Sequence, residues 1–89
     1  MIEQTFTIIN KLGLHARAAA KLVTTSSQFE ADIQVTRGER TVNGKSIMGL
    51  MMLAAAKGTE IIVSAKGDDA QQALLSIETL INDYFEEEE

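Results

Sequence analysis

The chain has 89 residues, no cysteine and a formal net charge of −5. The lack of cysteine excludes a disulfide scaffold and a thiolate metal site, and the acidic balance disfavours nucleic-acid binding. No apolar run approaches the roughly 18 residues that a membrane-spanning helix needs, and the N-terminus lacks the features of a signal peptide. We therefore expect one cytoplasmic domain over residues 1–89, without membrane insertion.

The charge is concentrated at the end of the chain. Without the glutamates at 86–89, 8 basic residues stand against 9 acidic ones, which is 13 less the final 4. We expect 86–89 to be a solvated acidic tail. The chain also has a single histidine, His15. Histidine is the residue type that titrates nearest to neutral pH, so His15 is the first candidate for chemistry.

The first half of the chain predicts a strand, a helix and a hairpin. Residues 2–9 alternate apolar and polar side chains like a strand, and an alanine-rich run from Ala16 predicts a helix that ends near Ser26 or Ser27. Residues 31–37 and 40–43 predict two strands joined by a two-residue turn that begins with glycine. The expected apolar face of the helix comprises Ala16, Ala19, Ala20 and Val23.

The second half predicts a short helix, a strand and a longer helix. Ser46 is a good N-cap for a helix that ends at Lys57-Gly58, and residues 60–66 alternate like a strand. Asp69, followed three residues later by Gln72, predicts a capping box. The last helix has an apolar stripe made of Ala70, Ala73, Leu74, Ile77, Leu80, Ile81 and Tyr84. The order β-α-β-β-α-β-α predicts a two-layer α+β sandwich with helices on one face of a sheet.

The segment from Gly13 to Arg17 predicts an anion site at a helix N-terminus. His15 occupies the N-cap position, and the N–H groups of Ala16, Arg17 and Ala18 are among the unpaired donors of the helix. Arg17 adds a guanidinium suited to phosphate oxygens. A nucleophilic imidazole there could accept a phosphoryl group whose charge is stabilised at once. The alternative is that His15 only caps the helix, although histidine is not a preferred N-cap.

Gly44-Lys45-Ser46 looks like the end of a phosphate-binding loop, but position 39 is glutamate where that motif needs glycine. Nucleotide binding by this route is therefore rejected. Ser46 has two interpretations. It is a plain N-cap, which the sequence favours, or a phosphorylation site at a helix N-terminus.

Met48, Met51 and Met52 share one helical neighbourhood. Because Ile47, Leu50 and Leu53 can supply the buried stripe, we expect the methionines to be divided between the core and an adaptable docking surface. If the two helix N-termini lie side by side, Arg17, Lys21, Lys45 and the methionines surround His15. That arrangement would suit an acidic partner with an apolar centre. The alternative is scattered, solubilising charge.

Two motifs together resemble the HPr family, the histidine-containing phosphocarrier proteins of the bacterial phosphoenolpyruvate-dependent sugar phosphotransferase system. They are Gly-Leu-His-Ala-Arg at 13–17 followed by alanines at 19–20, and Val-Asn-Gly-Lys-Ser-Ile-Met-Gly-Leu-Met at 42–51 followed by Ala-Lys-Gly at 56–58. The resemblance covers essentially the whole chain. It implies an antiparallel sheet of order 1-4-2-3 under three helices. One departure is Ala18, where the family usually has proline in the first helical turn; alanine restores an N–H there and loses some stiffness.

The resemblance also implies roles for particular residues. His15 would be phosphorylated at Nδ1 by Enzyme I and pass the group to IIA domains of sugar permeases, and Arg17 would neutralise the phosphohistidine. Ser46 would be a regulatory site for an HPr kinase/phosphorylase. The surface that docks partners would include Leu12, Ala20, Lys21, Lys45, Ile47, Met48, Met51 and Met52.

We expect a monomeric, stoichiometric carrier rather than an enzyme, with no metal and no cofactor beyond phosphoenolpyruvate as the indirect phosphoryl source. No second catalytic base or carboxylate pair accompanies His15 by motif. One alternative is a paralogous carrier of the nitrogen-related branch. The other is a regulatory binding module that transfers no phosphate.

Overall fold

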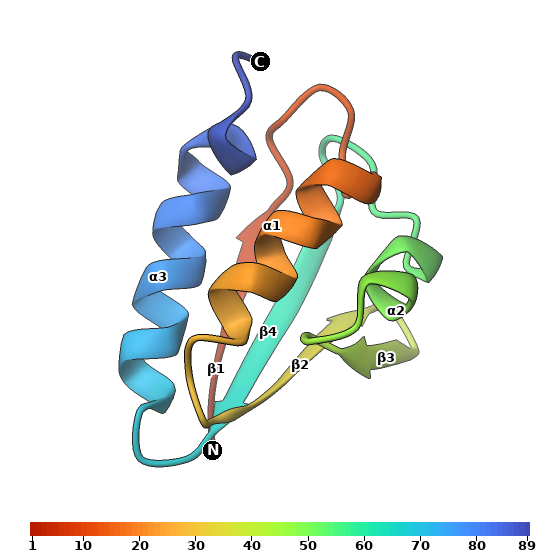
Figure 1. Ribbon diagram of the computed structural model, residues 1–89. Coiled ribbons are helices and arrows are strands. Elements are labelled where there is room, and N and C mark those ends of the chain that lie inside the picture. Colours follow the sequence, from red (N-terminus) through yellow and green to blue (C-terminus); the bar gives the residue numbers. More distant parts are fainter.

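Four strands form one antiparallel sheet in the computed structural model, which describes all 89 residues. In chain order they are β1 (Ile2–Thr7), β2 (Asp32–Arg37), β3 (Arg40–Asn43) and β4 (Glu60–Lys66). The spatial order is β1-β4-β2-β3, so the first and last strands are neighbours (Figure 1). This confirms the strand order that the family resemblance implied.

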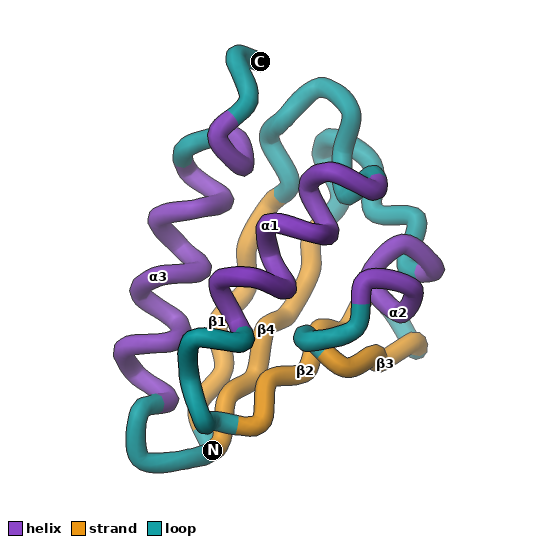
Figure 2. The backbone as a smooth tube through the Cα atoms, viewed as in Figure 1, coloured by secondary structure: helices purple, strands orange, loops and turns teal.

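Three helices cover one face of the sheet, as Figure 2 shows. They are α1 (Ala16–Ser26), α2 (Ile47–Met52) and α3 (Ala70–Asn82), and a single short turn with positive φ values, η1 (Tyr84–Glu86), follows. The predicted two-layer α+β sandwich and its element order are confirmed. None of the helices combines the length and the apolarity required to span a membrane.

The core forms between the helices and the two central strands. Side chains of β2 and β4 alternate between buried and exposed positions, because neighbouring residues of a strand point to opposite faces. The buried members are Ile33 and Val35 of β2 and Ile61, Val63 and Ala65 of β4. Ile33 pairs with Ala65 and Val35 with Val63, so these side chains form one apolar surface beneath the helices.

The strand ends differ slightly from the prediction. β1 ends at Thr7 rather than at position 9, although Ile8 still accepts a hydrogen bond from the Gly58 N–H at 2.7 Å. β2 begins at Asp32 rather than at position 31. The predicted two-residue turn between β2 and β3 is confirmed, with Gly38 at a positive φ of 60°.

The buried face of α1 is rotated from the expected one. The helix ends at Ser26, as predicted. Its buried residues are Ala18, Ala19, Leu22 and Ser26, whereas Ala16 is exposed and Ala20 and Val23 are only partly buried. Alanines occur on several sides of this helix, so the apolar pattern is weak, and the large Leu22 side chain sets the orientation.

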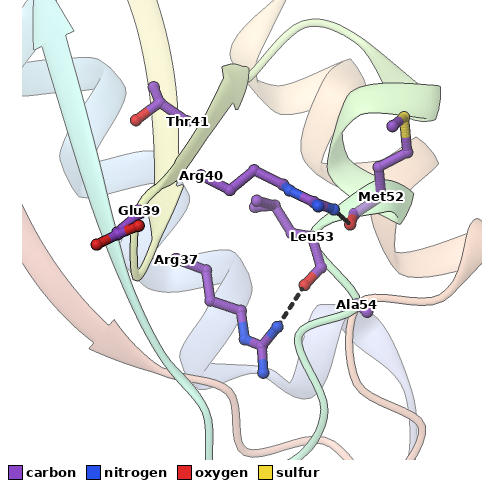
Figure 3. Close-up of a pocket in the computed structure, with 7 residues that line it drawn as sticks. All are labelled: Arg37, Glu39, Arg40, Thr41, Met52, Leu53 and Ala54. Atoms are coloured by element: carbon purple, nitrogen blue, oxygen red, sulfur yellow. Dashed lines mark hydrogen bonds between the residues drawn. The ribbon is translucent and has the colours of Figure 1, made fainter.

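α2 is shorter than predicted, because it ends at Met52 rather than near Lys57. Two arginines of the β2–β3 hairpin bind its last carbonyl oxygens (Figure 3). Arg40 donates to the Met52 carbonyl at 2.7 Å, and Arg37 donates to the Leu53 carbonyl at 3.0 Å. Cations are favourable at a helix C-terminus, and these contacts tie α2 to the sheet.

α3 buries the predicted stripe with one exception. Its buried residues are Ala70, Ala73, Leu74, Ile77, Leu80 and Ile81, whereas Tyr84 lies beyond the helix and is 40% exposed. The core position near this end is taken by Phe85, which is fully buried. The capping box at Asp69 is also wrong. The Asp69 carboxylate instead accepts the N–H groups of Glu30 and Ala31, both at 2.9 Å, and so joins α3 to the start of β2.

Candidate functional site

The loop before α1 is held against the segment that follows α2. Gly13 adopts a φ of +68°, and a Cβ there would lie 2.6 Å from the Ala55 carbonyl oxygen. Leu14 is buried and donates its N–H to the same oxygen at 2.8 Å. Only glycine fits at position 13 without strain. This contact fixes the position of the next residue, His15.

His15 is the N-cap of α1, as predicted. Its backbone is extended, and its carbonyl accepts the first helical hydrogen bond from the Ala19 N–H at 2.8 Å. The N–H groups of Ala16, Arg17 and Ala18 precede that bond and have no partner within the helix. The imidazole makes no capping hydrogen bond. The alternative in which the His15 side chain only caps the helix is therefore wrong.

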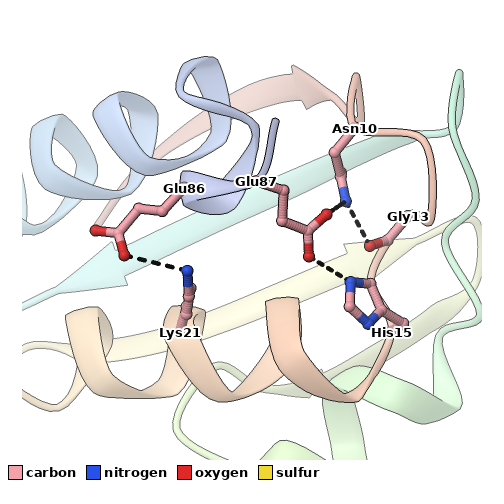
Figure 4. Close-up of polar contacts among 6 residues, drawn as sticks. All are labelled: Asn10, Gly13, His15, Lys21, Glu86 and Glu87. Atoms are coloured by element: carbon pink, nitrogen blue, oxygen red, sulfur yellow. Dashed lines mark hydrogen bonds and ion pairs between the residues drawn. The ribbon is translucent and has the colours of Figure 1, made fainter. Parts of the chain in front are cut away.

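The carboxylate of Glu87 lies against the His15 ring (Figure 4). Its Oε2 is 2.5 Å from His15 Nε2, and the Glu87 side chain is only 10% exposed. Asn10 Nδ2 donates to Glu87 Oε1 at 3.0 Å and to the Gly13 carbonyl at 2.8 Å. The other ring nitrogen of His15, Nδ1, makes no hydrogen bond within the chain.

Asn10 and Glu87 were both missed by reasoning from the sequence. Glu87 lies 72 positions after His15 and stands in a run of identical residues, so no spacing distinguishes it. Asn10 sits in the loop after β1 with no recognisable motif. The two residues meet because the folded C-terminal end lies beside the loop after β1. Hydrophobic periodicity in the sequence does not predict this placement.

Glu87 is ionised at neutral pH. Burial would raise its pKa, because desolvation penalises the charged form. The hydrogen bonds from Asn10 and His15 outweigh burial, and the charges of His15 and Arg17 act in the same direction. The net result is a pKa of Glu87 below its ordinary value of 4.5.

Glu86, Glu88 and Glu89 are exposed, as expected of a solvated tail, but that expectation is wrong for Glu87, whose side chain packs against His15. Lys21 Nζ lies 3.2 Å from the Glu86 carboxylate, and Lys11 Nζ lies 3.3 Å from that of Glu89. The Lys11 N–H also donates to the Glu89 carbonyl at 3.0 Å. Glu88 is exposed and forms no ion pair.

Arg17 lies where the predicted role, binding an anion beside His15, requires it. It is exposed and lines the same hollow as His15 and Glu87. Its guanidinium makes no hydrogen bond within the chain, so its donors are free for an anion at this end of the helix. No cluster of histidine, aspartate and glutamate side chains is arranged to hold a metal ion.

Lys45 does not join Arg17 and Lys21 around His15. Its Nζ donates to the Phe29 carbonyl at 2.8 Å, beyond the C-terminal end of α1. α2 begins at that end of α1, and its last turn is the part nearest to the start of α1 (Figure 1). The two helix N-termini are therefore at opposite ends, and the expected ring of three cations does not form.

The three methionines of α2 are all exposed, so the expected division between core and surface is wrong. Their exposed fractions are 69% for Met48, 40% for Met51 and 60% for Met52. Leu50 and Leu53 are buried as predicted, but Ile47 is 42% exposed. A helix of 6 residues buries only a narrow stripe, and the two leucines fill it.

An exposed apolar strip runs along α2 to the start of α1. We define the strip as Leu12, Ala20, Ile47, Met48, Met51 and Met52. Leu12 is 66% exposed, and Leu12 and Met51 line a shallow hollow together with His15 and Ala16. Ala20 is partly buried. The strip thus reaches the imidazole from the side of α2, while Glu87 reaches it from the other end of the chain.

Ser46 is the N-cap of α2, as predicted. Its Oγ accepts a hydrogen bond from the Gly49 N–H at 3.1 Å. The hydroxyl is partly exposed at the end of the strip away from His15.

Comparison with known sequences gives consistent matches over the whole chain. The family described as "PTS HPr component phosphorylation site" matches residues 2–83. Phosphocarrier protein HPr from Neisseria meningitidis is 55% identical over 100% of both chains. HPr from Pseudomonas aeruginosa is 50% identical over 93% of both chains. Phosphocarrier protein NPr from Shewanella violacea is 44% identical, with 97% of this chain and 94% of that protein covered.

Solved structures share the architecture. HPr-C-His from Thermoanaerobacter tengcongensis has a TM-score of 0.95 at 45% identity and covers 100% of both chains. HPr from Bacillus anthracis has a TM-score of 0.86 at 38% identity and covers 90% of this chain and 95% of that one. An HPr dimer from Thermoanaerobacter tengcongensis has a TM-score of 0.79 at 45% identity over 98% of this chain and 100% of that one.

Proposed function

The chain belongs to the HPr family of phosphocarrier proteins of the phosphotransferase system, and we propose that it carries a phosphoryl group on Nδ1 of His15. Phosphorylated Enzyme I is the donor, and IIA domains of sugar permeases are the acceptors. The observation that carries the proposal is the state of the His15 ring. Nδ1 has no partner, and the ring stands at a helix end whose first N–H groups are free.

The transfer moves one phosphoryl group between two nitrogen atoms. The lone pair of Nδ1 forms the new N–P bond, and the bond to the nitrogen of the donor breaks and returns its electron pair to that nitrogen. Such a loose transfer needs in-line positioning and charge stabilisation more than covalent help. The protein acts as a stoichiometric, monomeric carrier in the cytoplasm, without a cofactor, rather than as an enzyme.

The start of α1 supplies the charge stabilisation. A phosphoryl group on Nδ1 brings negative charge to the N–H groups of Ala16, Arg17 and Ala18, where the helix dipole favours an anion. The free guanidinium of Arg17 adds charge-assisted hydrogen bonds. Ala18 in place of the usual proline leaves one more N–H at this end.

The exposed strip provides the docking surface. Flexible methionines adapt to partners of different shape, which suits a carrier that must meet both donor and acceptors. Lys21 and Lys45 flank the strip, and acidic partners would complement them.

Ser46 is the proposed regulatory site for an HPr kinase/phosphorylase. A phosphate there would place about 1.5 to 2 negative charges at the end of the docking strip and weaken the binding of Enzyme I. Transfer kinetics of a Ser46→Asp chain test this, and unchanged kinetics would contradict it.

Incubation with phosphoenolpyruvate and Enzyme I tests the central proposal. The chain should gain one acid-labile phosphoryl group, detected by intact mass, and His15→Ala should gain none. Ser46→Ala is the control, because it keeps the imidazole and should be labelled like the unchanged chain. Labelling of His15→Ala would refute the assignment.

A carrier of the nitrogen-related branch is the second candidate, because an NPr protein also matches at 44% identity. Titration against Enzyme I from each branch separates the two candidates. The branch whose Enzyme I labels the chain fully at the lower concentration is the one to which the chain belongs. The third candidate is a regulatory module that transfers no phosphate, and it predicts no labelling by either Enzyme I.

A further inference from the structure

Hydrogen bonds connect His15 to Glu87 from the other end of the chain, and Glu87 to Asn10 and the Gly13 carbonyl (Figure 4). Asn10 Nδ2 bridges the Gly13 carbonyl at 2.8 Å and Glu87 Oε1 at 3.0 Å. Glu87 Oε2 is 2.5 Å from His15 Nε2. Because Glu87 is an ionised acceptor, Nε2 is the ring nitrogen that carries the proton in this contact.

The chain end that carries Glu87 is held firmly in place. Tyr84, Phe85 and Glu86 all adopt positive φ values, of 57°, 54° and 64°. This left-handed turn costs roughly 1–2 kcal/mol for each non-glycine residue, so it needs compensation. The full burial of Phe85 and the ion pair of Glu86 with Lys21 provide it. Glu87 is therefore positioned by the fold and does not reach His15 by chance.

On the basis of the proposed function, we infer that Glu87 is a positioning residue for phosphoryl transfer and that Asn10 holds it in place. The carboxylate keeps the proton on Nε2, which leaves the lone pair on Nδ1. It also stabilises the positive charge that the ring gains as Nδ1 bonds to phosphorus.

The proton and charge balance supports this role. A neutral imidazole with a proton on Nε2 becomes a phosphoimidazolium when Nδ1 takes up the phosphoryl group, and no proton leaves. On the return transfer, the N–P bond breaks, its electron pair returns to Nδ1, and the ring is neutral again with the same proton. Glu87 faces Nε2, on the side of the ring away from the phosphoryl group, so its attraction for the ring cation opposes its repulsion of the phosphate.

The test is a competition between two chains for one pool of phosphoryl groups. The unchanged chain, labelled with ¹⁵N so that the masses differ, is mixed with equal Glu87→Gln chain, a trace of Enzyme I and limiting phosphoenolpyruvate. At equilibrium, the ratio of the two phosphorylated species measures the relative stability of phosphohistidine in each chain, whatever the docking kinetics. We expect a ratio of about five in favour of the unchanged chain, which corresponds to the net contribution of one typical hydrogen bond.

Glu88→Gln is the matched control, because it makes the same charge change one residue away at an exposed, unpaired side chain. It should share the label equally with the unchanged chain. A second variant, Asn10→Ala, keeps the carboxylate but frees it from its support, and should shift the ratio in the same direction by less. Thermal unfolding of each variant ensures that only folded chains are compared.

Each outcome has a distinct meaning. Equal partition with Glu87→Gln, or the same shift with Glu88→Gln, overturns the role of Glu87. Failure of every chain to become labelled refutes the proposed function instead. Two-bond ¹H–¹⁵N spectra of the His15 ring provide an independent readout. A ring that carries its proton on Nδ1 in the unchanged chain would also overturn the inference.

Discussion

The N-termini of α1 and α2 lie in the same layer of helices but satisfy their backbone donors differently. At α2, Ser46 Oγ accepts the Gly49 N–H at 3.1 Å, so one of the unpaired donors is capped by a side chain next to it in sequence. At α1, His15 makes no side-chain cap, and its ring is held instead by Glu87 from the far end of the chain. α2 therefore has a side-chain cap from its own sequence, whereas the first N–H groups of α1 have no cap from the His15 side chain.

The comparison teaches where to seek a ligand in a small, open domain. Both ends follow a glycine-containing loop, and both sequences place a polar residue at the N-cap. The difference lies in what the cap side chain does, because serine is a preferred N-cap and accepts a helical N–H here, whereas histidine is not a preferred N-cap and accepts none. Three predictions test this distinction, from the largest effect to the smallest.

Gly13→Ala should have the largest effect, because it attacks the loop that places His15. The new Cβ combines a positive φ with a 2.6 Å approach to the Ala55 carbonyl oxygen. We expect the free energy of unfolding, measured by urea denaturation, to fall by about 3 kcal/mol. Gly38→Ala is the control, since its φ is also positive but a Cβ there meets nothing within 4 Å. It should lose about 1 kcal/mol from strain alone. Equal losses would show that the contact with Ala55 is unimportant.

Ser46→Ala should lower the free energy of unfolding by about 1 kcal/mol, because it removes the side-chain N-cap of α2. Phosphoryl acceptance by His15 should not change in this variant, whereas His15→Ala should lose it. Ser27→Ala, at an exposed serine beyond the end of α1, should change stability by less than about 0.5 kcal/mol. A cost no larger than that of Ser27→Ala would mean that the two helix ends do not differ as described.

The pH dependence of stability should show the smallest effect. Burial raises the pKa of Glu87, but the hydrogen bonds from Asn10 and His15 and the charges of His15 and Arg17 lower it. The net result is a pKa in the folded chain below the ordinary value. The unfolded chain therefore takes up this proton first as the pH falls. The stabilisation is complete above the ordinary pKa of 4.5 and is lost as the pH falls through the lower folded value. Between pH 6 and about 3, the free energy of unfolding should fall less steeply with decreasing pH for Glu87→Gln than for Glu88→Gln. Urea denaturation at each pH measures it.

The fold could be predicted in outline because its elements depend on local patterns. Alternation identified β2 and β4, and the stripe from Ala70 to Ile81 identified α3. The errors occur where a contact between residues far apart in sequence determines the end of an element or the partner of a side chain. The end of α2 depends on Arg37 and Arg40 from the hairpin, and the Asp69 carboxylate is used by the backbone of another loop.

Only the part of the site formed by sequence neighbours could be predicted. His15 and the N–H groups that follow it are neighbours in sequence, so helix-end physics places them together. Glu87 and the position of Lys45 depend on how the chain ends and helices meet in space, which neither composition nor spacing specifies. The acidic run was interpreted from its charge alone, whereas burial of Phe85 directs it onto the imidazole.

The pairing of β1 with β4 has a consequence for the order in which the protein matures. β1 has no other partner in the sheet, and His15 lies just after β1. The loop that holds His15 also needs Ala55, which is made shortly before β4, and the imidazole needs Glu87, which is made later still. A ribosome-bound chain thus carries its histidine through most of translation without the geometry that serves it. Under the proposed function, phosphorylation of His15 would therefore report completed folding, and partly folded chains would not take up phosphoryl groups.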